Sequence, residues 1–135
     1  MNTTEIGKIG EKLAARYLKK NGYKICDKNV HQSHNEIDII AVNKVFIVFA
    51  EVKTRSVSSE GDSLPYGVPS QAVTKAKQIR LIKAANDYLL KNKSKKISNK
   101  QPRLDVIEVY LDKSAEKPTV LKIEHFENAV TRKNI

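Results

Sequence analysis

Several residue types are scarce in this chain of 135 residues, and each scarcity excludes a class of protein. Cys26 is the only cysteine, so no disulfide can form within the chain, which suits a reducing compartment. No apolar run approaches the length needed to span a bilayer. The first five residues have neither the charged start nor the apolar block of a secretory signal peptide. We therefore expect a cytoplasmic protein with no membrane partner.

Aromatic residues and glycines are also few. The chain has no tryptophan and only three phenylalanines and five tyrosines, so stacking of nucleic-acid bases is not an obvious binding mode. None of the five glycines forms a phosphate-binding loop or a dinucleotide fingerprint, which disfavours phosphoryl chemistry with ATP. The length suits a single domain over residues 1–135, and we expect the tail from about residue 127 to fray.

Acidic residues are nearly missing from about a quarter of the chain. Residues 71–103 carry ten lysines and arginines against Asp87 alone, and this block supplies nine of the ten net positive charges. A local excess of this kind favours a polyanion partner, because binding releases counterions and the field steers the encounter. A solvated helix face and a lysine-rich loop would have the same composition, so charge alone supports both interpretations equally.

Periodicity predicts two helices and five strands. Apolar residues at helical spacing predict a helix over residues 3–20, capped by Asn2 or Thr3 and ended by Asn21-Gly22, and a second helix over about 70–91 capped by Ser70. Strands are expected over residues 23–30, 36–42, 45–53, 104–111 and 120–126, with a tight turn at Asn43-Lys44. The order α-β-β-β-α-β-β implies an α/β (α+β) fold with a mixed sheet flanked by helices.

Two of these apolar strands carry acidic residues, which is costly unless something binds the charge. Glu51 and Lys53 share one face of a strand, and a hairpin can bring Asp38 beside Glu51. Two neighbouring carboxylates repel each other unless a hard cation such as Mg²⁺ or Mn²⁺ lies between them. Such an ion can activate water and polarise a phosphodiester, and Lys53 is placed to act on that water or on the phosphate. Ordinary surface charges at the end of a strand are the alternative.

Further polar residues are candidates for the same site. Glu11 lies beside Gly7 and Gly10 on the first helix, where small side chains allow close approach to the sheet. Gln71 and Lys75 share a helix face near a helix start, which also favours phosphate. Arg103 alternates with Asp105 on a strand; we assign Asp105 a structural role and Arg103 a weak phosphate contact.

These motifs together resemble the YraN-like family of small bacterial proteins over nearly the whole chain. The resemblance runs through Gly7 to Ala14, Tyr17-Leu18, Gly22-Tyr23, Asn35 to Ala41, Phe49 to Arg55, the helix containing Lys75, and Arg103 to Val106. That family in turn resembles the PD-(D/E)xK nuclease superfamily, including Holliday-junction resolvases. The resemblance implies a restriction-endonuclease-like core with Asp38, Glu51 and Lys53 in the motif positions and Glu11 as a further metal-site acid.

The leading hypothesis is therefore a Mg²⁺- or Mn²⁺-dependent DNA endonuclease, or a structure-selective nuclease in the manner of a resolvase. Asp38, Glu51, Lys53 and Glu11 are the expected catalytic residues, and the three acids are the expected metal ligands. The expected nucleic-acid contacts are Arg55, Gln71, Lys75, Lys91, Lys93, Lys95, Lys96 and Arg103. A nucleic-acid-binding module without cleavage and a protein-interaction domain remain open alternatives, and a homodimer is a further expectation because resolvase-like relatives are often dimers.

Overall fold

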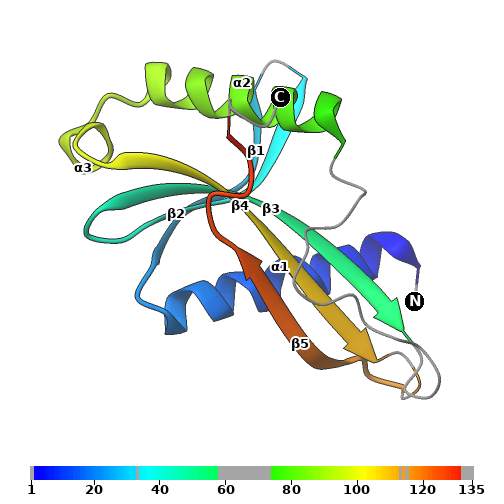
Figure 1. The fold of residues 1–135 in the computed structure, drawn as a ribbon. Helices are drawn as coiled ribbons and strands as arrows, with labels where there is room; N and C mark the ends of the chain where they lie inside the picture. Colours follow the sequence, from blue (N-terminus) through cyan, green and yellow to red (C-terminus); the bar gives the residue numbers. More distant parts are fainter. Residues whose placement is uncertain (1, 33, 58–73, 113, 115, 132–135) are drawn as a thin grey trace.

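The computed structural model describes residues 2–32, 34–57, 74–112, 114 and 116–131. The chain forms a five-stranded sheet, long helices on either side of it, and one short helical turn (Figure 1). The elements are α1 (Thr3–Lys20), β1 (Lys24–Gln32), β2 (Asn35–Val42), β3 (Phe46–Val57), α2 (Lys75–Lys91), α3 (Lys95–Ser98), β4 (Gln101–Asp112) and β5 (Thr119–Phe126). The predicted mixed α/β fold and its element order are confirmed, with α3 as an added turn inside the lysine-rich connection.

The strands lie in the sheet in their order along the chain, from β1 to β5. The pairs β1–β2, β2–β3 and β4–β5 are antiparallel, whereas β3 and β4 are parallel because α2 carries the chain back across the sheet. Ile39 pairs with Ala50, so the residues that follow this pair in register, Asp38 and Glu51, stand next to each other. The hairpin thus brings the two acids together as predicted.

Each face of the sheet packs against one long helix (Figure 1). Ala14 and Leu18 of α1 pack on the side chains of Val48, Ala50 and Ile107, and these residues form one apolar cluster. The second cluster, on the opposite face, joins Leu81, Ala84 and Tyr88 of α2 to Ile40, Phe49 and Val106. Alternation along β3 assigns Glu51 and Lys53 to the α2 face, together with Phe49.

The first helix has the predicted bounds and caps. The side chain of Asn2 accepts a hydrogen bond from the Glu5 N–H at 2.9 Å, and Gly22 adopts a positive φ of 89° just after the helix. Gly10 allows close packing, because a Cβ at this position would lie 1.8 Å from Thr54 Oγ1 on β3. At Gly7 a Cβ would meet nothing within 4 Å, so the packing explanation holds for only one of the two glycines.

Two boundary predictions need correction. The second helix begins at Lys75 and its N-cap is Thr74, whose Oγ1 accepts from the Lys77 N–H at 3.2 Å, whereas the predicted cap, Ser70, lies outside the described residues. The tail does not fray from residue 127. Val130 is buried and its N–H donates to the Leu104 carbonyl at 3.3 Å, because an apolar side chain this close to α2 is more stable packed than solvated.

No helix in the described part of the chain is both long enough and apolar enough to cross a membrane.

Candidate functional site

A cavity of about 630 Å³ opens where the first half of α1, the middle of β3 and the start of α2 meet. Its walls include four of the residues selected from sequence, and Lys77 of α2 joins them. The lining residues are Thr3, Ile6, Gly7, Glu11, Asp38, Glu51, Val52, Lys53, Thr54, Ser56 and Lys77. One polar cavity therefore results from three features of the fold: the β2–β3 register, the close packing of α1 at Gly10, and the position of the crossover helix α2.

Asp38 is the most perturbed acid of this hollow. Its Oδ2 accepts a hydrogen bond from the Val52 N–H at 2.8 Å, which fixes the carboxyl group against β3. Burial, followed by repulsion from Glu51, raises the pKa of Asp38 to about 8 even though that hydrogen bond acts in the opposite direction. Glu11 and Glu36 add smaller repulsions. The nearby lysines thus do not offset burial and repulsion enough to keep Asp38 readily ionised.

Glu51 lies between two lysines. Its Oε1 is 2.5 Å from Lys77 Nζ and 3.9 Å from Lys53 Nζ, and only 8% of its side chain is exposed. Burial and the proximity of Lys77 lower the pKa of Lys53. Burial also opposes the charge on Lys77, but its hydrogen bonds, first to Glu51, outweigh burial and raise its pKa. Of the two amines, Lys53 is therefore the one that gives up its proton more easily.

Glu11 reaches the same cavity but is held by a neighbour. In the orientation that satisfies both atoms of its amide, Asn29 donates to Glu11 Oε1 at 2.7 Å and to Glu36 Oε1 at 3.0 Å. Asn29 stands opposite Asp38 on β1 with a positive φ of 51°, a conformation that asparagine tolerates better than most residues. Burial, followed by the charge of Glu36, raises the pKa of Glu11.

The carboxylate oxygens at this site suit a hard divalent cation that takes few of its ligands from the protein. Within the described residues no three His, Cys, Asp or Glu side chains converge closely enough to hold an ion. Asp38 and Glu51 do lie together, and Mg²⁺ is commonly held by one or two carboxylates, with water and phosphate completing its shell. The ammonium group of Lys77 already sits against Glu51 as a cation, which supports the fit. The predicted direct role of Glu11 as a third ligand stays a prediction.

Arg103 is not brought to this cavity. It lies on the α1 face, where Nε and Nη2 bind the Asp105 carboxylate at 3.0 and 2.9 Å and Nη1 is 2.9 Å from Glu127 Oε1. His125 Nε2 lies 2.6 Å from Asp105 Oδ2. We call these four residues the Arg103 network. Because the guanidinium group is buried and its partners are acidic, Arg103 supports the fold, and the structural role predicted for Asp105 agrees with this arrangement.

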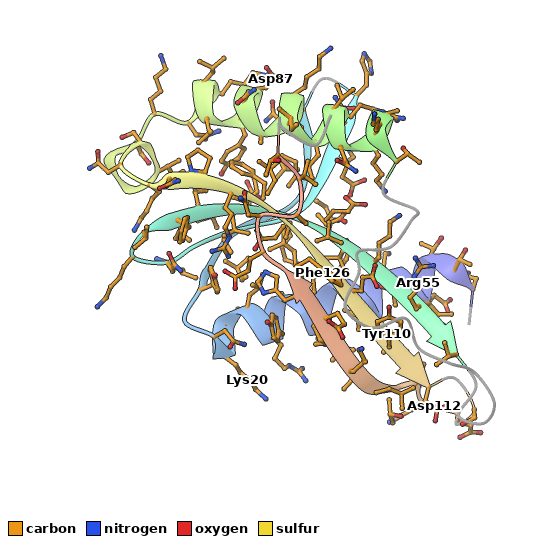
Figure 2. The ribbon with its side chains drawn as sticks, viewed as in Figure 1. Lys20, Arg55, Asp87, Tyr110, Asp112 and Phe126 are labelled. Carbon is orange, nitrogen blue, oxygen red and sulfur yellow. The ribbon has the colours of Figure 1, made fainter. Side chains whose placement is uncertain are left out.

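The other predicted nucleic-acid contacts are spread over the molecule. Arg55 lies on the same strand face as Lys53, and in the sheet it pairs with Tyr110 of β4, near the C-terminal ends of both strands (Figure 2). Lys75 is exposed at the first turn of α2, and Gln71 lies outside the described residues.

The lysine-rich segment lies at the far end of α2 from the cavity (Figure 1). Lys91 Nζ donates to Gln32 Oε1 at 3.2 Å, and Lys93 is exposed. Lys95 and Lys96 begin α3. At 1.5 Å of rise per residue, Lys91 is about 21 Å along the helix from Lys77, so this segment does not line the cavity.

Sequence reasoning missed Lys77 and Asn29. A signal for Lys77 was present: α2 has no acidic residue in its first turn, and lysine there opposes the helix dipole. Placing the cap at Ser70 instead of Thr74 concealed that signal, because it put Lys77 in the second turn. For Asn29 no comparable signal exists, since its role depends on a positive φ in the middle of a strand.

Comparison with known proteins places the chain in a family. Residues 10–109 match the uncharacterised protein family UPF0102. A UPF0102 protein of Caldanaerobacter subterraneus subsp. tengcongensis is 45% identical over 129 residues, covering 96% of this chain and 97% of its own. Another from Alkaliphilus oremlandii is 45% identical over 125 residues, covering 93% and 97% of the two chains. The chain therefore belongs to the uncharacterised protein family UPF0102, the YraN family, as its motifs predicted.

Proposed function

We propose that this protein is a Mg²⁺-dependent endonuclease that cleaves phosphodiester bonds in DNA. One observation carries the proposal: Asp38 and Glu51 meet in a cavity beside Lys53, and burial followed by repulsion from Glu51 raises the pKa of Asp38 to about 8. Carboxylates held together at this cost are typical of sites that receive a cation. The resemblance of the motif residues to the PD-(D/E)xK nucleases adds to this support.

Each residue has a defined task in this proposal. Asp38 and Glu51 hold the ion, and the bound ion supplies charge stabilisation at the phosphate and a water of lowered pKa. The Val52 N–H keeps the Asp38 carboxyl group in place. Lys53, whose pKa is lowered by burial and by Lys77, can accept a proton from a water or hold a phosphate oxygen.

A polyanionic substrate suits the charge of the chain. The net charge is +10, and Arg80 follows Lys77 along α2 away from the cavity. Each phosphate that such residues neutralise contributes a salt-dependent part of the affinity.

Cleavage of plasmid and branched DNA with Mg²⁺ or Mn²⁺ tests the proposal. We expect Glu51→Ala and Lys53→Ala each to reduce the rate at least about 100-fold, as the loss of an electrostatic catalytic group commonly does. Lys83→Met is the matched control, because Lys83 is exposed and lies outside the cavity walls. Wild-type protein no more active than Glu51→Ala would contradict cleavage of these substrates.

A second candidate is a nucleic-acid-binding module without cleavage. The observation that favours it is the separation of exposed Lys91 and Lys93 from the cavity, which allows binding that does not involve the acids. Salt-dependent DNA binding without metal, unchanged in Glu51→Ala and weakened in Lys91→Gln, Lys93→Gln, would support this candidate over the nuclease.

A further inference from the structure

Lys77 makes the shortest contact of the site. It is the third residue of α2, and its Nζ lies 2.5 Å from Glu51 Oε1. The Lys77 side chain is 38% exposed, whereas that of Glu51 is 8% exposed. The ammonium group thus closes the solvent side of a nearly buried carboxylate, in a helix turn whose dipole disfavours positive charge.

Two cavities meet at this contact. Besides the larger cavity, a hollow of about 180 Å³ lies between α2 and the start of β2, and its walls include Glu36 and Arg80. Asp38, Glu51 and Lys77 are the residues that line both. The Lys77 amine therefore stands at the junction through which an ion or a phosphate would approach the carboxylates.

We propose that Lys77 is a resident counter-cation that a divalent metal must displace from Glu51, and that the displaced amine then binds a phosphate of the nucleic acid. This inference rests on the metal site proposed above. A Mg²⁺ ion bound to Glu51 competes with the Lys77 ammonium group for the single negative charge of that carboxylate, which neutralises only one of them. The positive charge of the ion also repels the amine.

The surroundings determine where the displaced amine goes. It cannot move toward Lys53, whose Nζ already occupies that side of Glu51 at 3.9 Å from the same oxygen. Lysine has a flexible four-carbon stem, so the amine can swing toward solvent without moving α2. A phosphate beside the ion offers it a new acceptor. Metal binding and nucleic-acid binding are therefore coupled through one side chain.

Mn²⁺ titration of the full chain, followed calorimetrically, tests the competition without relying on activity. We expect Lys77→Met to bind Mn²⁺ about fivefold more tightly than wild type, a factor that matches the loss of one partly exposed ion pair. Lys83→Met, on the same helix, should leave the affinity unchanged, and Glu51→Ala should abolish binding. Lys77→Gln is a second neutral variant, should methionine impair folding.

DNA binding as a function of salt tests the release of the amine. With Ca²⁺ at the site, Lys77→Met should flatten the slope of log affinity against log salt by about 0.9, one phosphate contact, whereas without metal the slope should not change. If Mn²⁺ binds in a Glu51-dependent manner but folded Lys77 variants bind it equally or more weakly, Lys77 is not a competitor. If neither wild type nor these variants bind Mn²⁺, the metal site itself is refuted.

Discussion

Two clusters of charged residues lie in this small domain, and they are built in opposite ways. In the Arg103 network, Asp105 is fully buried and accepts hydrogen bonds from Arg103 and from the Asn128 N–H, with His125 in contact. Burial alone would raise the pKa of Asp105, but these partners outweigh it and lower the pKa. Every charge there has a fixed partner.

At the Asp38 site, burial and repulsion outweigh the contacts that stabilise the charged carboxylate. Asp38 keeps one backbone hydrogen bond, and burial followed by the repulsion of three acids raises its pKa to about 8. Burial, followed by the proximity of Lys77, lowers the pKa of Lys53. A satisfied cluster stabilises a fold, whereas an incompletely neutralised cluster in a cavity costs stability and is retained for binding. The following predictions test this contrast.

Removal of Asp105 should have the largest effect. Asp105→Ala leaves the buried Arg103 guanidinium without its main partner, and we expect the free energy of unfolding to fall by about 3–5 kcal/mol. Urea unfolding at neutral pH measures the loss. Asp38→Ala is the matched control at the other cluster, where we expect no loss. Similar losses for both variants would remove the distinction between the clusters.

The first helix supports both clusters, since Glu11 lines the cavity and Tyr17 Oη lies 3.0 Å from His125 Nδ1. Gly10→Ala should lower the free energy of unfolding by about 1–3 kcal/mol, because the added methyl group collides with Thr54. Gly7→Ala, three residues away with open space around it, should raise it by up to about 1 kcal/mol. Thermal unfolding compares the two. Equal effects would mean that α1 is not fitted tightly to β3.

The difference between the clusters could be predicted only partly from sequence. Alternation and apolar spacing identified the strands, and the pairing of Asp38 with Glu51 follows from a hairpin whose turn is visible in the sequence. Acidic residues on apolar strands signalled both clusters equally. Which acid would be neutralised depended on partners far away in the chain: Asp105 is satisfied by His125 and Asn128, and no spacing rule reveals those contacts.

The start of α2 shows why Lys77 was not predicted as a residue of the cavity. Ser70 and Thr74 are both acceptable caps, but a start at Ser70 puts Lys77 in the second turn and not in the first. Lys77 precedes the buried Leu81 by four residues, so the two share a helix face, whereas strand faces follow from simple alternation. Three cavity residues on strands, Asp38, Glu51 and Lys53, were therefore selected from the sequence, whereas Lys77 on the helix was not.

The two clusters should respond oppositely to pH. The folded pKa of Asp38, about 8, exceeds its ordinary value, so folding favours the protonated form and stability falls as pH rises from about 4 to 8. The pKa of Asp105 is depressed, so its contribution is present above the ordinary pKa and is lost as pH falls through the folded value.

Asp38→Asn should remove the decline at the alkaline side and raise the free energy of unfolding at pH 8 by on the order of 1 kcal/mol. Asparagine can still accept the Val52 N–H, which makes it a close structural match. Urea unfolding in EDTA from pH 4 to 8 measures both profiles. Saturating Mg²⁺ should remove the decline in wild type but not alter the variant. A wild-type profile that is flat between pH 5 and 8 would show that Asp38 is ionised throughout.

The smallest expected effect concerns nucleic-acid binding by the basic block over residues 71–103. Lys91 is exposed and Arg103 is buried among acids, although both belong to the same basic block in sequence. Lys91→Gln should weaken DNA binding by less than about tenfold and reduce the slope of log affinity against log salt by about 0.9. Arg103→Gln should leave that slope unchanged while lowering thermal stability, because a neutral amide cannot replace the charged, paired contacts to Asp105. A reduced slope in Arg103→Gln with unchanged stability would mean that this guanidinium faces the polyanion, and the contrast between a structural network and a binding site would then fail at its best-defined residue.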